Sequence, residues 1–131
     1  MTYNQNDDLK YAIENNGLDG DFEETDIKKI IAEVAGENDE YSWYWIVSLN
    51  SDKFALLEGG CDYTGWDCQS SLSVIGDSTK EPLELIARLT DDVMGYEPRD
   101  KDNIRLNLLR QLEGTQPFGL YTEGLKQQEE L

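Results

Sequence analysis

The chain has 131 residues, enough for one compact domain, and we expect a single domain over residues 1–131. It carries 28 acidic and 11 basic side chains and no histidine, a net charge of −17 that repels nucleic acid and anionic membranes. No apolar stretch is long enough to cross a bilayer and no secretory signal is visible, so the sequence predicts a cytoplasmic protein without direct contact to nucleic acid or membrane.

The first segment, residues 1–40, is acidic and has helical spacing. Residues 7–17 and 26–36 each carry an apolar stripe and end in a glycine, so two helices are predicted, the second with Thr25 as its N-cap. The first stripe consists of Leu9, Ala12 and Ile13. The second stripe consists of Ile27, Ile30, Ile31 and Val34.

Residues 41–77 have the two-residue period of strands. In SWYWIVSL the alternation places Trp43, Trp45 and Val47 on one face of a strand and Tyr44 and Ile46 on the other. A turn-forming break separates this strand from FALLEGG, and SSLSVIG follows the cysteine-containing loop as a third strand. The segment is therefore predicted to be a three-stranded antiparallel meander.

The last third returns to helical spacing. Residues 81–114 predict a pair of helices, the first with Pro82 in its opening turn, and residues 115–131 predict a turn followed by a polar tail. The expected buried positions of this pair are Leu83, Ile86, Leu89, Val93, Ile104, Leu106, Leu108, Leu109 and Leu112. The sequence thus predicts an α+β fold, with a small antiparallel three-stranded sheet flanked by N-terminal and C-terminal helices.

The loop EGGCDYTGWDCQS, residues 58–70, holds both cysteines. Two thiols without any histidine cannot complete an ordinary zinc site, and the six-residue gap between Cys61 and Cys68 is not that of a thioredoxin-type motif. A disulfide across a folded-back hairpin and a site completed by carboxylates are alternatives. In a reducing cytoplasm we expect two buried thiols.

The residues between the cysteines have the pattern of a type I turn, with Asp62 first and Gly65 fourth. Asp62 is expected to accept a hydrogen bond from the backbone two residues later. Tyr63 and Trp66 flank this turn, either closing the end of the core or facing a partner. The carboxylates of this loop also allow a calcium or magnesium site, although their spacing is not that of an EF-hand. The candidate ligands are Glu58, Asp62 and Asp67.

Catalytic chemistry has little support in the sequence. Without histidine the usual general base at neutral pH is missing, and no nucleophile elbow, P-loop or dinucleotide-binding glycine motif is present. Catalysis by paired carboxylates such as Asp62 and Asp67 is an alternative, since such pairs need no local spacing. We therefore expect a protein that is not an enzyme, with no cofactor and no catalytic residue.

Carboxylates are concentrated before Tyr41, beyond what helix N-termini and linkers need. Such an excess favours an electropositive partner, because closely spaced carboxylates can imitate the charge of a nucleic acid. The predicted partner-binding carboxylates are Asp19, Asp21, Glu23, Glu24, Asp26, Asp39 and Glu40. Tyr63 and Trp66 are the predicted apolar anchors.

The loop CDYTGWDCQSS resembles a motif in small bacterial and phage proteins of unknown activity, in which a strand enters a Cys-Asp-Tyr-Thr-Gly-Trp-Asp-Cys loop and leaves as another strand. This resemblance covers Trp45 to Val74. By size and charge the chain is also similar to phage-encoded inhibitors of host defence nucleases, such as anti-CRISPR proteins. This similarity in size and charge implies an interaction protein that blocks a basic surface of a host nucleic-acid-binding protein. The alternatives are a small-ligand or metal-responsive domain built on residues 58–69, and a housekeeping domain.

Overall fold

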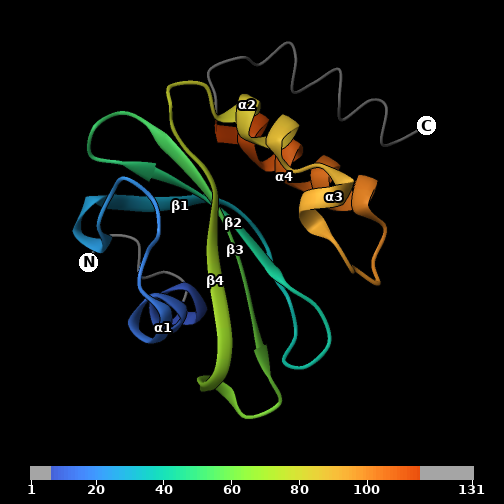
Figure 1. The fold of residues 1–131 in the computed structure, drawn as a ribbon. Helices are drawn as coiled ribbons and strands as arrows, with labels where there is room; N and C mark the ends of the chain where they lie inside the picture. Colours follow the sequence, from blue (N-terminus) through green and yellow to red (C-terminus); the bar gives the residue numbers. More distant parts are fainter. Residues whose placement is uncertain (1–6, 116–131) are drawn as a thin grey trace.

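A four-stranded antiparallel sheet lies between helices on both of its faces (Figure 1). The computed structural model describes residues 7–115. Its elements, in chain order, are α1 (Asp7–Asn16), the 3-10 turn η1 (Glu24–Asp26), β1 (Ile27–Val34), β2 (Trp43–Leu49), β3 (Phe54–Asp62), β4 (Gly65–Thr79), α2 (Pro82–Arg88), α3 (Asp91–Met94) and α4 (Lys101–Thr115).

The strands follow one another across the sheet in the order β1-β2-β3-β4, each antiparallel to its neighbour. Helix α1 packs on one face, mainly against β4, whereas α2 and α4 cover the other face (Figure 1). Both faces of the sheet are therefore covered, and β2 is buried at every position.

The predicted three-stranded sheet is wrong, because the second predicted N-terminal helix is the strand β1. Pairing with β2 places Ile27, Ile30 and Glu33 opposite Leu49, Val47 and Trp45. One register shift lies between Ile27 and Ile30, and a second lies between Ile30 and Glu33. Each shift inserts one extra residue, so side chains of one face recur every three residues instead of every two. This bulged spacing imitates a helical stripe in the sequence.

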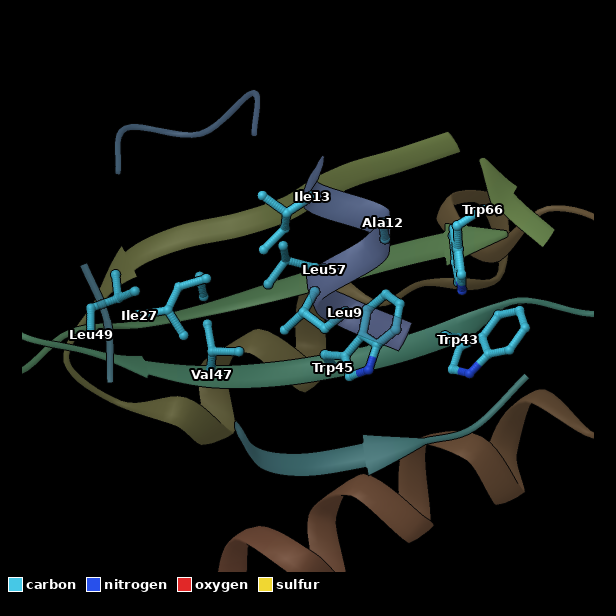
Figure 2. Packing of buried hydrophobic residues seen from close by; sticks show 11 residues of the cluster. Leu9, Ala12, Ile13, Ile27, Trp43, Trp45, Val47, Leu49, Leu57 and Trp66 are labelled. Carbon is cyan, nitrogen blue, oxygen red and sulfur yellow. The ribbon is translucent and has the colours of Figure 1, made fainter. Parts of the chain in front are cut away.

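The predicted alternation along β2 is confirmed. Trp43, Trp45 and Val47 belong to the core beneath α1, and Tyr44 and Ile46 belong to the core beneath α2 and α4. Figure 2 shows the α1-side core, where side chains of α1 lie over the sheet and the three tryptophans gather at one end. The full set drawn there is Leu9, Ala12, Ile13, Ile27, Trp43, Trp45, Val47, Leu49, Ala55, Leu57 and Trp66.

The first predicted helix is confirmed as α1. Its predicted apolar stripe is buried, and the chain leaves the helix at Gly17, whose φ of 72° lies in the region that glycine adopts without strain. The Gly17 N–H donates to the Ile13 carbonyl at 2.7 Å, which satisfies one of the orphan acceptors at the helix end.

The predicted apolar face of the C-terminal helices is confirmed in α4 and is wrong in part around α2 and α3. In α2 the fully buried side chain is Leu85, with Leu89 directly after the helix, whereas Leu83 and Val93 are 38% and 42% exposed. The chain breaks between α2 and α3 at Thr90, so a stripe counted through that break assigns the wrong positions. Ile104, Leu108 and Leu112 of α4 are buried as expected. The turn and tail predicted beyond residue 115 lie outside the described residues.

Among residues 7–115, no helix has the length and apolar character needed to cross a membrane. The edge strand β1 is covered by α4 in a specific way. The Gln111 side chain accepts from the Glu33 N–H at 2.9 Å and donates to the Glu33 carbonyl at 2.8 Å. One amide thus replaces a missing strand at that position, which shields the edge from pairing with another chain.

Candidate functional site

The N-terminal part of the chain runs alongside β4, the other edge strand. Four contacts mark its path: Asp8 with Trp66, Asn16 with Ser70, Asp19 with Val74, and Asp21 with Asp77. From Trp66 to Asp77 the strand covers about 35 Å at the usual rise of ~3.3 Å per residue. Residues 8–21 therefore follow β4 over most of its length.

This arrangement assembles a surface that we call the acidic strip. Residues 7–26 and β4 together hold ten carboxylates and one lysine, whereas residues 81–115, which are equal in number, hold eight carboxylates and five basic side chains. The net charges are −9 and −3, so the negative charge is concentrated on the α1 and β4 side. The strip consists of Asp8, Glu14, Asp19, Asp21, Asp67 and Asp77.

The predicted acidic residues do not all lie on this strip. Asp19 and Asp21 belong to it, and the three carboxylates of Glu23–Asp26 continue from it around the end of the sheet next to the turn after β2, where the Asn50 N–H donates to the Asp26 carbonyl at 2.8 Å. Asp39 and Glu40 lie at the opposite end of the sheet, in the connection between β1 and β2. The structure thus brings five of the seven onto one continuous stretch of chain.

Several of these carboxylates also hold the local structure. Asp19 accepts from the Val74 N–H at 2.8 Å, which satisfies an edge donor of β4, and Asp77 accepts from the Asp21 N–H at 2.8 Å. Asp26 accepts from the Glu23 N–H at 2.9 Å at the start of η1. Their acceptor oxygens are therefore structural, while their negative charge is a separate property that an amide would lack.

The hairpin between β3 and β4 has the predicted turn. Asp62 accepts from the Thr64 N–H at 2.9 Å and from the Thr64 hydroxyl. These hydrogen bonds lower the pKa of Asp62, and the bond from the hydroxyl has the larger effect. Gly65 pairs with Asp62 and has a φ of 106°. The aspartate and the glycine are therefore explained by the turn itself.

The two cysteines are free thiols, and the expectation that both are buried is wrong for Cys68, which is exposed. Cys61 is half-buried and packs against the tryptophan cluster, with its thiol 3.2 Å from the Asn38 side-chain oxygen. Burial, together with Asp8 and Asp62, raises the pKa of the Cys61 thiol, which disfavours the nucleophilic thiolate.

Trp66 and Tyr63 have opposite environments. Trp66 is only 6% exposed, and its ring lies 4.9 Å from that of Trp43 and 6.1 Å from that of Trp45 (Figure 2). Its indole N–H donates to Asp8 at 3.1 Å. Tyr63 is 77% exposed at the tip of the hairpin. Trp66 therefore closes the core, and Tyr63 is the aromatic side chain of this hairpin that a partner can reach.

A pocket of about 530 Å³ lies between α1 and the start of β4. Tyr11 and Trp66 supply aromatic surface, and Glu14 and Asp67 supply carboxylates from opposite walls. The remaining lining residues are Asn15 and Gly65. The α1 residues of this pocket were not predicted as site residues, because their proximity to β4 follows from tertiary packing and has no signal in the sequence.

A second cluster of ionisable groups is structural. The Tyr44 hydroxyl donates to Glu97 at 3.1 Å, and Arg99 donates to Glu97 at 2.8 Å and to the carbonyls of Ala35 and Ser42 at 2.7 and 2.6 Å. Burial raises the pKa of Glu97, but the hydrogen bonds from Arg99 outweigh this effect and leave the pKa below its ordinary value. This cluster fastens the loop before α4 to the β1–β2 connection.

Within residues 7–115, no group of three or more histidine, cysteine, aspartate or glutamate side chains is arranged to hold a metal ion. The metal-responsive alternative therefore lacks a ligand set in that part of the chain. The chain matches no protein-family model, no curated protein and no solved structure. The resemblance of the Cys61–Cys68 loop to small bacterial and phage proteins stays a prediction.

Proposed function

We propose that this protein is a non-enzymatic interaction protein whose acidic strip binds a basic surface of a partner protein. The observation that carries the proposal is the concentration of charge: net −9 on residues 7–26 and β4, against −3 on the equally long helical segment 81–115. A protein whose acidic residues served solubility alone would have no need to gather them along one edge of its sheet.

The spacing of the charges suggests attraction rather than imitation of a phosphate backbone. Six carboxylates over about 35 Å give one charge every ~6 Å, whereas one DNA strand carries a charge every ~3.4 Å. The strip therefore has roughly half the linear charge density of a single strand. It suits a protein surface rich in lysine and arginine, which is also how a basic nucleic-acid-binding protein presents itself. That the partner belongs to a host and that this chain comes from a phage stay predictions.

Two triple variants with the same net charge test the proposal. The strip variant carries Asp19→Asn, Asp21→Asn and Asp77→Asn, and its asparagine oxygens can still accept the structural hydrogen bonds from Val74 and Asp21. The control variant carries Asp92→Asn, Asp100→Asn and Asp102→Asn, all at exposed positions in or beside α3 and α4, on the face of the sheet opposite α1. Both have a net charge three units less negative than the original chain.

Each protein is immobilised, exposed to a cell lysate at low salt and eluted with a salt gradient. The original chain and the control variant should retain the same basic proteins and release them as salt rises, because screening shortens the reach of surface charges. The strip variant should lose them. Equal retention by the strip and control variants would refute the assignment to the strip, and a captured protein that ignores salt would refute electrostatic binding.

A further inference from the structure

The pocket between α1 and β4 combines aromatic surface with free acceptors. Trp66 is almost fully buried and offers a narrow apolar floor, whereas Tyr11 is 47% exposed and offers a ring along one wall. Glu14 and Asp67 are both exposed. An apolar floor with two carboxylates above it favours a ligand with an aliphatic stem and a positively charged end.

The two carboxylates are not used by the fold. Among the residues that the structure describes, neither the Glu14 nor the Asp67 side chain forms a hydrogen bond or an ion pair, in contrast to Asp8, Asp19 and Asp77 of the same strip. Their oxygens are therefore available to a donor that enters the pocket.

We infer that this pocket receives an arginine side chain of the basic partner, an assignment that deepens the proposed function and rests on it. The guanidinium would stack on the Tyr11 ring and donate to the Glu14 and Asp67 carboxylates, while its aliphatic stem covers the exposed edge of Trp66. Charge complementarity favours this occupant, because a pocket with two unpaired carboxylates in a protein of net charge −17 attracts cations and repels anions.

Arginine fits this chemistry better than lysine. A planar guanidinium stacks on an aromatic ring and presents several donors at once, so one group can serve both carboxylates, whereas an ammonium is a compact and strongly hydrated charge. The same chain shows the stacking geometry elsewhere, because Arg99 lies with its guanidinium carbon 4.2 Å from the centre of the Tyr41 ring while it donates to Glu97.

The test titrates the ¹⁵N-labelled full chain with Nα-acetyl-arginine amide and follows the backbone amide signals by NMR. The amides of Tyr11, Asn15, Gly65 and Asp67 should shift together, with the N–H of Gly65 and Asp67 reporting the β4 wall. Nα-acetyl-citrulline amide, which has the same shape without the charge, should cause no such shifts. Nα-acetyl-lysine amide should bind more weakly than the arginine compound.

Substitutions in the pocket should weaken arginine binding while leaving the spectrum dispersed. Glu14→Gln and Asp67→Asn are each expected to lower the affinity about three- to fivefold. The control Asp92→Asn, an exposed position in α3 on the opposite face of the sheet, should leave the affinity unchanged. Absence of shifts at the pocket amides, equal binding of citrulline or lysine, or an equal effect of the Asp92 control would each overturn the assignment of the pocket to arginine.

Failure of this inference can be told apart from failure of the proposed function. The strip variant changes Asp19, Asp21 and Asp77, none of which lines the pocket. If the strip variant loses the basic proteins while the arginine compound does not bind, the strip carries the interaction without this anchor. If the arginine compound binds but the strip and control variants retain the same proteins, the pocket is a cation site and the proposed function is wrong.

Discussion

Two of the buried tryptophans donate their indole N–H groups to acidic side chains near the surface. The Trp45 indole N–H donates to Glu33 at 2.8 Å, and the Trp66 indole N–H donates to Asp8 at 3.1 Å. Because a buried N–H without an acceptor costs about 1–3 kcal/mol, these carboxylates stabilise the core beneath α1. Part of the acidic composition therefore serves the fold, and counting carboxylates in the sequence cannot separate this part from the rest.

Because Trp66 is buried and Tyr63 is exposed, truncating them should change the stability of the protein by very different amounts. Trp66→Ala should lower the free energy of unfolding by about 3–5 kcal/mol, because it removes a buried indole from a three-tryptophan cluster together with its hydrogen bond to Asp8. Tyr63→Ala should change it by less than about 0.5 kcal/mol. Guanidinium chloride denaturation measures both, and similar losses for the two variants would contradict the burial that the structure assigns to them.

Glu58 predicts a measurable pH dependence. Burial raises the pKa of Glu58, and the neighbouring hydroxyl groups of Tyr44 and Ser42 offset this rise only in part. Between its ordinary pKa and the raised value, the folded protein holds more of this proton than the unfolded chain, so the contribution of Glu58 makes stability fall as pH rises. Glu58→Gln removes that contribution, and the free energy of unfolding should then decline less as the pH rises above 4.5, the ordinary pKa of a glutamate.

The control for this prediction is Glu40→Gln, which changes the net charge equally at an exposed position. Both variants reduce the general repulsion among carboxylates by the same amount, so any difference between their pH profiles belongs to Glu58. Urea denaturation across the pH range provides the profiles. Identical slopes for the two variants would show that the Glu58 environment is not what the structure describes.

At the scale of elements, the Gln111 side chain of α4 covers the edge of β1 at Glu33. Gln111→Ala would leave the N–H and the carbonyl of Glu33 without their partner, and we expect a loss of about 1–2 kcal/mol in the free energy of unfolding. The uncovered edge should also promote association between chains. Denaturation and size-exclusion chromatography measure the two effects, with Asn103→Ala on the same helix as the control. A monomer as stable as the control would contradict the role of Gln111.

The local sequence predicts a helix or strand correctly where one hydrophobic period continues without interruption along the whole element. The alternation of β2 and the stripe of α1 identify both elements and their faces, and Asp62 with Gly65 identifies the hairpin turn. The period fails at β1, where two bulges convert a strand pattern into three-residue spacing, and at Thr90, where the chain breaks between α2 and α3. Bulges and helix breaks depend on pairing and packing with distant segments, which a single sequence does not specify.

The candidate site was predictable only in part, for the same reason. The acidic stretch of residues 19–26 and the aromatic hairpin are both visible in the sequence. Their arrangement along β4 depends on the register between residues 8–21 and the strand, through contacts more than fifty residues apart. Tyr11 and Glu14 become pocket residues through this packing alone, and Asp39 and Glu40 are separated from the others by the length of β1.

For the whole molecule, the decisive property is the uneven distribution of charge. A net charge of −17 attracts any basic surface at long range, but it gives no preferred orientation if it is spread evenly. The concentration on the α1 and β4 side provides that orientation, and the hairpin with Tyr63 lies at one end of the same side. Complementary charge of this kind mainly raises the association rate and specificity, so binding should weaken strongly as salt screens it.

The most direct test of this account is the affinity of the first captured basic partner for the original chain, the strip variant and the control variant, measured by titration calorimetry at low salt. Neutralising three strip carboxylates at about 0.5 kcal/mol each should weaken binding about tenfold. The control variant, with the same net charge, should bind like the original chain. If the two variants bind equally well, net charge alone governs the interaction, and the acidic strip along β4 is not the binding surface.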